Sequence, residues 1–91
     1  MDQNKIGERI RELRNEQRIS QDELAKILSI TRLTLGKYER GTRTPDASAI
    51  NVLSHTFNVS ADYILGLSDA RNPEYREIMS EYGLNEKSAE I

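Results

Sequence analysis

The sequence has no cysteine and no long apolar run, and these two absences narrow the class of protein. Without cysteine, neither a disulfide framework nor a thiolate metal site is available, and a reducing compartment is expected. No stretch approaches the roughly 18 apolar residues of a membrane span, and the N-terminal MDQNKIGERI lacks the apolar core of a signal peptide. We therefore expect a soluble, cytoplasmic protein with no membrane association. A chain of 91 residues makes one domain with one compact core.

Residues that could support catalysis or bind a metal are equally sparse. His55 is the one histidine, and no Cys, His or Asp lies at ligand spacing from it. The carboxylates of Asp22 and Glu23 are adjacent in sequence and point apart, so they do not form a general acid and base. No phosphate-binding glycine loop and no Ser/His/Asp set is found. We expect no enzymatic activity, no metal and no cofactor, and we expect His55 to lie on the solvent side of a helix.

The net charge of −2 conceals an uneven distribution of charge along the chain. Residues 1–43 carry ten Lys and Arg against seven Asp and Glu, whereas residues 44–91 carry three against eight. The first part is therefore cationic and the second acidic. Such an asymmetry bears on the partners of a protein rather than on its fold.

Apolar residues recur at spacings of three and four throughout, and alternation at two is nowhere sustained, so we predict an all-α domain. A first helix is predicted over about residues 5–17. Ser20 and Glu23 have the form of a capping box, which starts a second helix that runs to about Leu28. Thr31 is a suitable N-cap for a third helix over about residues 32–39. Two short helices thus meet across about three residues, which is the spacing of a helix-turn-helix.

The remaining helices are predicted from their end signals. Gly41 is placed to end the third helix in a left-handed conformation. Pro45 suits the first turn of a fourth helix, where its missing N–H costs nothing. Ser60 caps a short fifth helix that stops near Gly66. Helices of these lengths are not stable alone, so all five need a shared core.

From Ser68 onward the composition becomes acidic and polar, and we predict a division into residues 1–67 and a helical C-terminal extension, residues 68–91. One more helix is predicted after Asn72, and its apolar positions repeat at i, i+3, i+4 and i+7: Tyr75, Ile78, Met79 and Tyr82. This stripe either packs onto the first and fifth helices or forms a dimer seam or effector-domain contact. Residues 84–91 have the pattern of the beginning of a further amphipathic helix, and we expect the chain to be a piece of a longer protein.

The string SQDELAKILSITRLTLGKYERGTRTPD, residues 20–46, closely resembles the helix-turn-helix of the Xre family, the phage-repressor and Cro type of DNA-binding protein. The resemblance continues through VSADYILG, residues 59–66, and covers about residues 5–67. It implies a compact five-helix fold of the lambda-repressor type that binds double-stranded DNA.

The third helix carries the residues expected to contact bases. Leu35 and Tyr38 are three apart and face the core, so the rows of Arg32 and Gly36, and of Leu33 and Lys37, lie on the other side. Arg32 can present its fork to guanine O6 and N7, Lys37 can reach a guanine edge or a phosphate, and Leu33 can pack on a thymine methyl group. Gly36 lets the backbone approach the groove, at a helix cost of about 1 kcal/mol relative to alanine. In the family, the positions of Leu33 and Gly36 are more often polar, which shifts the weight of base reading to Arg32 and Lys37.

Phosphate contacts are expected on either side of the third helix. Gln21 lies in the first turn of the second helix, where the amide, the free N–H groups and the helix dipole favour a phosphate oxygen, and the resemblance assigns it that role. The full predicted phosphate set is Gln21, Thr31, Thr34, Arg40, Thr42, Arg43 and Thr44. Glu39 lies at a helix C-terminus, where the dipole disfavours a carboxylate, and so it needs a partner. The resemblance pairs it with Arg14 in a structural ion pair.

Each assignment has a plainer alternative. Arg32 and Lys37 can be an ordinary solvated helix face, Leu33 an exposed leucine without a role, and Gln21 a neutral first-turn residue. The loop at residues 40–44 can be a polar connector.

For the whole protein, the leading hypothesis is a sequence-specific transcriptional regulator, a repressor that binds a palindromic operator as a homodimer. The alternative is a protein-interaction module on the same fold, an antitoxin or a partner of a regulatory protein. A non-specific chromatin-like binder is disfavoured by the acidic net charge.

Overall fold

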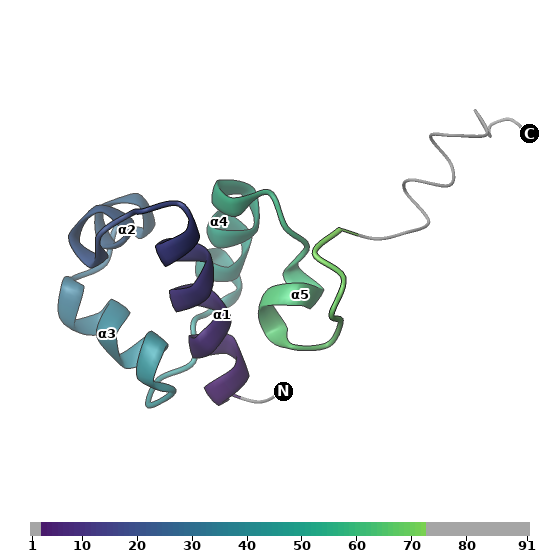
Figure 1. Ribbon diagram of the computed structural model, residues 1–91. Helices are drawn as coiled ribbons and strands as arrows, with labels where there is room; N and C mark the ends of the chain where they lie inside the picture. The colour runs from purple at the N-terminus through teal and green to yellow at the C-terminus, as the bar shows by residue number, and fades with distance from the viewer. Residues whose placement is uncertain (1–2, 73–91) are drawn as a thin grey trace, which may run out of the picture.

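The computed structural model describes residues 3–72, and within them the chain forms five α-helices and no strand. The helices are α1 (Gln3–Glu16), α2 (Gln21–Leu28), α3 (Arg32–Arg40), α4 (Ala47–Phe57) and α5 (Ala61–Leu65). In Figure 1, α1 lies in the middle of the domain, with α2 and α3 on one side of it and α5 on the other. The prediction of an all-α domain is confirmed. None of the helices in this part of the chain is long and apolar enough to cross a membrane.

The helix ends follow the local signals in the sequence. The Ser20, Thr31 and Ser60 hydroxyls each accept a hydrogen bond from the backbone N–H three residues later, so all three predicted N-caps are confirmed. Gly41 and Gly66 end α3 and α5 with φ of 79° and 80°, the left-handed conformation that glycine adopts at no steric cost. These caps fix both ends of α3, the helix on which the predicted base contacts lie.

The prediction for Pro45 is wrong. Asp46 is the N-cap of α4 and accepts a hydrogen bond from the N–H of Ala49 at 2.8 Å, so the helix begins at Ala47 and Pro45 precedes it. A carboxylate that can satisfy an N–H of the first turn is a strong N-cap, and it moves the helix start two residues past the proline. Pro45 is buried instead.

All five helices contribute to one hydrophobic core. The largest fully buried side chains come from each of them, and none is more than 1% exposed. They are Ile6 and Ile10 of α1, Leu24 of α2, Leu35 of α3, Leu53 of α4 and Ile64 of α5. This shared core holds α3 against α1 and leaves the opposite side of α3 facing outward.

Gly7 allows α1 to approach the C-terminal end of α3 closely. A Cβ atom at this position would lie 2.5 Å from the carbonyl oxygens of both Tyr38 and Glu39, which is far inside van der Waals contact. No feature of the sequence around Gly7 indicates this contact, because it depends on a helix about thirty residues away. Any larger residue would separate the two helices.

Residues 68–72 pack back onto α1. Arg9, 8% exposed, donates to the carbonyl oxygens of Tyr63 and Ser68 and pairs with Asp69 at 2.8 Å. Arg71 pairs with Glu16 at 2.7 Å, and this contact lowers the pKa of the Glu16 carboxyl and raises that of the arginine. Residues 68–72 therefore belong to the packed domain, which extends past the predicted boundary at residue 67. The predicted stripe of Tyr75, Ile78, Met79 and Tyr82 lies outside the described residues, as do residues 84–91.

Candidate nucleic-acid interface

A tight turn joins α2 to α3. Ser29 adopts a left-handed conformation at φ 58°, and its N–H bonds to the carbonyl of Lys26 at 3.1 Å, which ends α2. Only Ile30 and Thr31 follow before α3 begins, and the Thr31 hydroxyl accepts from the N–H of Thr34 at 3.1 Å. The two helices are thus held at a short separation by local hydrogen bonds at both sides of the turn.

The two sides of α3 differ sharply in exposure. On the inner side Leu35 is 0% and Tyr38 4% exposed, so these residues anchor the helix in the core. On the outer side Leu33 is 67% exposed, and so is the Arg32 side chain. The amphipathic assignment from the sequence placed these four side chains correctly. No element within residues 3–72 covers the outer side at Arg32 and Leu33.

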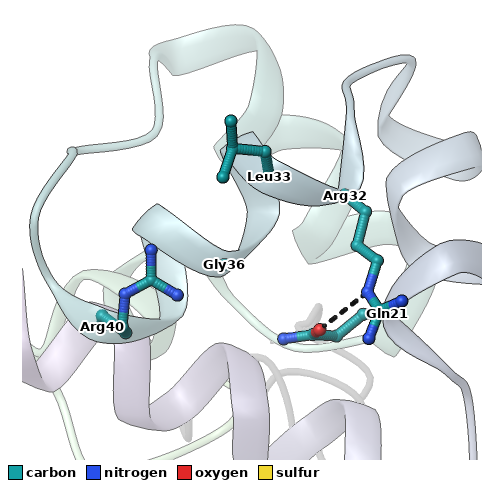
Figure 2. A pocket seen from close by; sticks show the side chains of 5 residues that line it. All are labelled: Gln21, Arg32, Leu33, Gly36 and Arg40. Atoms are coloured by element: carbon teal, nitrogen blue, oxygen red, sulfur yellow. Dashed lines mark hydrogen bonds between the residues drawn. The ribbon is translucent and has the colours of Figure 1, made fainter.

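The outer side of α3 is hollowed. A surface hollow of about 310 Å³ is lined by Gln21, Arg32, Leu33, Gly36 and Arg40. In Figure 2 the side chains of Arg32 and Arg40 lie on either side of Leu33 and Gly36. Three of the four predicted base-contacting residues therefore meet in one place.

Lys37, the fourth predicted base-contacting residue, is half-buried and does not line the hollow. Arg40 lines it instead, although from sequence it was assigned to the phosphate set. The signal that could have found it is the spacing, because residues 32, 36 and 40 are each four apart and lie in one row along a helix.

Gly36 differs from the expectation of an open backbone. The residue is buried, and a Cβ atom there would lie 3.0 Å from Nη1 of Arg40 and within 4 Å of Cζ and Nη2 of the same guanidinium. The guanidinium of Arg40 therefore covers Gly36. The missing side chain at this position accommodates an arginine, and the backbone is not bare.

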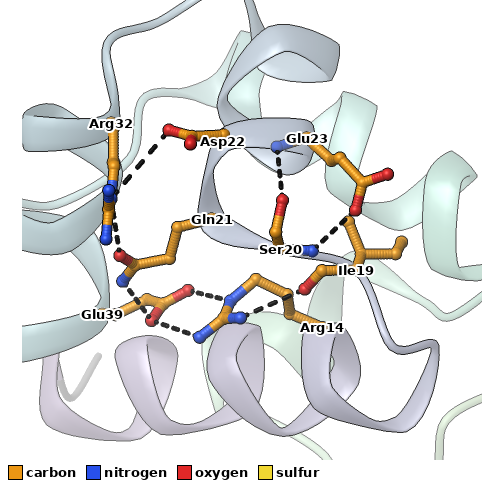
Figure 3. Close-up of polar contacts among 8 residues, drawn as sticks. All are labelled: Arg14, Ile19, Ser20, Gln21, Asp22, Glu23, Arg32 and Glu39. Atoms are coloured by element: carbon orange, nitrogen blue, oxygen red, sulfur yellow. Dashed lines mark hydrogen bonds and ion pairs between the residues drawn. The ribbon is translucent and has the colours of Figure 1, made fainter.

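A chain of polar contacts leads from the core to Arg32 (Figure 3). Arg14 donates from Nε and Nη2 to the two carboxylate oxygens of Glu39 at 2.7 and 3.1 Å, so the expected ion pair is present, and the Glu39 side chain is only 4% exposed. Gln21 donates from Nε2 to Glu39 at 3.1 Å and accepts from Nε of Arg32 at 3.3 Å. Arg32 also lies 3.9 Å from Asp22, with both side chains 67% exposed, a distance and exposure at which an ion pair contributes little.

Gln21 is therefore more than a first-turn residue. Its amide connects the buried ion pair to the exposed guanidinium of Arg32, which no local pattern in the sequence indicates. The amide nitrogen carries two hydrogens and gives one to Glu39, so one donor remains.

The other residues of the predicted phosphate set surround α3. Thr31, Thr42 and Arg43 are exposed, whereas Thr34 and Thr44 are half-buried. The Thr31 hydroxyl donates to Oγ1 of Thr34 at 3.0 Å, and the Thr42 hydroxyl donates to the carbonyl of Lys37 at 3.3 Å. A hydroxyl has one hydrogen, and Thr31 gives its hydrogen to Thr34. The Thr34 hydroxyl therefore keeps its own hydrogen for another acceptor.

Basic side chains dominate α3 and the loop after it, with the exposed acid Asp22 of α2 lying beside Arg32. Arg32, Lys37, Arg40 and Arg43 all belong to α3 or to the loop that follows it. Glu39 is the one acid between residues 32 and 45, and it is buried and paired with Arg14. A short turn, an anchored α3 as the second helix of the motif, and basic side chains on its outward face together define a helix-turn-helix domain.

The comparisons with known proteins agree with this geometry. The chain matches the helix-turn-helix family over residues 10–64. It is 33% identical over 86 residues to the HTH-type transcriptional regulator ImmR of Bacillus subtilis, a match that covers 94% of this chain and 67% of ImmR. It is 36% identical over 87 residues to the antitoxin PezA of Streptococcus pneumoniae, covering 88% of this chain and 55% of PezA. The fold is similar to that of the P22 c2 repressor protein solved in complex with a synthetic operator, with a TM-score of 0.65, 30% identity, and coverage of 69% of this chain and 96% of that one.

This chain belongs to the helix-turn-helix family. The domain that it carries is a DNA-binding domain of the transcription-regulator type. The chain spans 67% and 55% of the lengths of the two curated relatives named above.

Proposed function

We propose that this protein is a sequence-specific transcriptional repressor that acts in the cytoplasm and binds a palindromic DNA operator as a homodimer. The observation that carries the proposal is the outward side of α3, where Arg32 and Leu33 are exposed around a cationic hollow while Leu35 and Tyr38 anchor the inner side. A helix presented in this way fits the major groove of DNA.

The outward side chains have distinct chemical roles in base reading. The guanidinium of Arg32 donates to O6 and N7 of a guanine, and Leu33 packs on the methyl group of a thymine. Gly36 has no side chain, and the guanidinium of Arg40 covers its position. Lys37, at the edge of the helix, contacts a guanine or a neighbouring phosphate. Asp22 and Gln21 hold Arg32 in the absence of DNA and release it to the base pair, since the contact with Asp22 at 3.9 Å is exposed and weak.

Phosphate contacts fix the position of α3 without reading sequence. Gln21 donates its remaining N–H to one phosphate, and the Thr34 hydroxyl, which accepts from Thr31, donates to the same strand. The loop after α3 supplies the contacts at the other end of the helix: Thr42, Arg43 and Thr44. Arg40, the remaining member of the predicted phosphate set, lies on the outward side of α3 instead.

The proposal of a dimer rests on the small number of base pairs that one α3 can contact. A single reading helix contacts too few base pairs for repressor-like specificity, and helix-turn-helix domains pair across half-sites about one helical turn apart. We assign dimerisation to residues 68–91, with contacts from Tyr75, Ile78, Met79 and Tyr82. Repression then requires only that the bound dimer occupies a promoter.

Selection from a pool of random-sequence duplexes tests this function. The full chain is bound to the pool, bound duplexes are amplified, and the cycle is repeated several times. The expected result is enrichment of one palindrome with two half-sites about one helical turn apart. Failure to enrich any sequence would remove the proposal.

The second candidate is a protein-interaction module, and its specific support is the 36% identity to an antitoxin. An antitoxin or a regulatory partner on this fold would bind a protein through the acidic C-terminal part of the chain. The same selection separates the two, because a module that binds only protein enriches no duplex. Binding of a partner protein by a chain that also enriches a palindrome would leave repression as the primary function.

A further inference from the structure

We infer that Arg40 contacts a second guanine of the operator. Because Gly36 has no side chain, it leaves space for the guanidinium of Arg40 on the outward side of α3. The inference rests on the proposed function and deepens it. The outward side of α3 then carries two guanine-reading arginines, Arg32 and Arg40, with the apolar Leu33 between them.

The position of Arg40 in the helix makes this reading possible. Residues 32, 36 and 40 form one row along α3 because residues four apart lie one above the other. Long side chains of a helix lean toward its N-terminus, over the preceding turn. The side chain of Arg40 therefore runs from the end of the helix back toward its middle.

The structure places the guanidinium where this rule predicts. Nη1 of Arg40 lies 3.0 Å from the point that a Cβ atom of residue 36 would occupy, and Cζ and Nη2 lie at 3.8 and 3.9 Å. Any side chain at position 36 would displace it. Glycine destabilises a helix by about 1 kcal/mol relative to alanine. The space that the Arg40 guanidinium occupies over residue 36 is a specific reason for glycine at this position.

The surroundings of Arg40 leave its charge available to a ligand. Within residues 3–72 the side chain of Arg40 makes no hydrogen bond and no ion pair, whereas Nε of Arg32 donates to Gln21 at 3.3 Å. Its guanidinium lines the hollow that also contains Leu33 and the Arg32 side chain (Figure 2). A planar fork with free donors on the reading surface matches O6 and N7 of a guanine.

The alternative for Arg40 is a phosphate contact, and binding measurements separate the two roles. The operator obtained from the random pool is prepared with every single base-pair substitution in one half-site, and the other half-site is left unchanged. Affinities are measured for the full chain and for Arg40→Ala, Gly36→Ala and Arg43→Ala. Arg43→Ala is the matched control, because it removes one arginine from the loop after α3. Thermal melts verify that each variant is folded.

The inference predicts position-specific losses. The unchanged chain should prefer guanine at the Arg40 position by about 5- to 100-fold. Arg40→Ala should reduce this preference to less than about 3-fold and leave the other preferences unchanged. Gly36→Ala should weaken the same preference although no charge is lost. Arg43→Ala should weaken every duplex by the same factor and lower the slope of log affinity against log salt by about one unit.

Two results would overturn the inference while leaving the proposed function intact. One is uniform weakening of all duplexes by Arg40→Ala, as expected for a phosphate contact. The other is loss of the guanine preference in Arg40→Ala but not in Gly36→Ala, which would show that Gly36 does not position the guanidinium of Arg40. If the unchanged chain selects no sequence at all, the proposed function fails and the inference fails with it.

Discussion

Gly7 and Gly36 both lie inside helices, yet their surroundings predict opposite effects of the same substitution. Replacing a helical glycine with alanine favours the helix by about 1 kcal/mol. A Cβ atom at Gly7 would lie 2.5 Å from two backbone carbonyl oxygens of α3, which cannot move without separating the helices. At Gly36 it would meet only the end of the flexible Arg40 side chain at 3.0 Å.

Gly7→Ala should therefore lower the free energy of unfolding by about 1–3 kcal/mol, as overpacked cores do. Gly36→Ala should raise it by up to about 1 kcal/mol. Urea denaturation followed by circular dichroism measures both. A Gly7→Ala protein as stable as the unchanged chain would show that α1 does not approach α3 as closely as described.

Arg32 is the residue whose loss should alter base preference most directly. Its side chain is 67% exposed on α3 and can reach a guanine edge. Arg32→Ala should lose about 1–3 kcal/mol of binding free energy at one base pair, measured with operator duplexes substituted at single positions. Equal weakening on the operator and on scrambled DNA would reject a base-reading role.

At the scale of the element, the ion pair between Arg14 and Glu39 joins α1 to the C-terminal part of α3. The Glu39 side chain is 4% exposed and accepts two bonds from Arg14 and one from Gln21, so its removal leaves the largely covered guanidinium of Arg14, 14% exposed, with only its hydrogen bond to the Ile19 carbonyl. Glu39→Ala should lower the free energy of unfolding by about 3–5 kcal/mol.

The matched control for Glu39→Ala is Glu16→Ala. It breaks the ion pair with Arg71, in which both side chains are about 40% exposed, and should change stability far less. Thermal denaturation and DNA affinity are both measured. Glu39→Ala should have a lower melting temperature, while the protein that is still folded should bind DNA as the unchanged chain does. An unchanged melting temperature in Glu39→Ala would show that the pair does not hold α3.

The start of α2 should make stability depend on pH. The N–H of Ser20 donates to Oε1 of Glu23 at 2.8 Å, which lowers the pKa of the Glu23 carboxyl below its ordinary value of 4.5. A carboxyl with a lowered pKa in the folded state stabilises the protein above pH 4.5, and this contribution is lost as the pH falls through the lowered pKa.

Melting temperatures measured from pH 6 to pH 2 should therefore fall in the acid range, and less steeply in Glu23→Gln. A glutamine can still accept from Ser20 but does not titrate. Glu16→Gln should also make the melting temperature depend less on pH in this range, because Arg71 lowers the pKa of the Glu16 carboxyl. Identical pH profiles in Glu23→Gln and the unchanged chain would contradict the contribution of the capping box.

The helix ends were predictable because their causes are local. Ser20, Thr31 and Ser60 cap their helices through atoms only three residues away. Pro45 was placed wrongly because two adjacent residues both carry a start signal, and the hydrogen bond of Asp46 decides between them. Periodicity also separated the inner from the outer side of α3.

The remaining features depend on contacts that no local pattern encodes. Gly7 matters because α3 passes within 2.5 Å of its missing Cβ, and Gln21 because two side chains from α3 reach its amide. The place of Arg40 depends on the direction of a long side chain and on the absence of one at Gly36. Such features require the packed structure.

At the scale of the whole molecule, the proposal requires two copies of the chain on one operator. Sedimentation equilibrium with a labelled operator duplex should give two chains per duplex, because each α3 contacts one half-site. A chain that stops at residue 72 keeps the described domain and should bind the same operator more weakly. Equal affinity of both chains would remove residues 73–91 from the dimer contact, and a monomer both free and on DNA would remove the dimer itself.

The central claim is that the outward side of α3 distinguishes one DNA sequence from another, and the ratio of two dissociation constants tests it most directly. The constants are those of the full chain for its selected operator and for a scrambled duplex of equal length and composition, measured at one physiological salt concentration. The account predicts at least about 10³-fold tighter binding to the operator. Equal affinity for the two duplexes would contradict it.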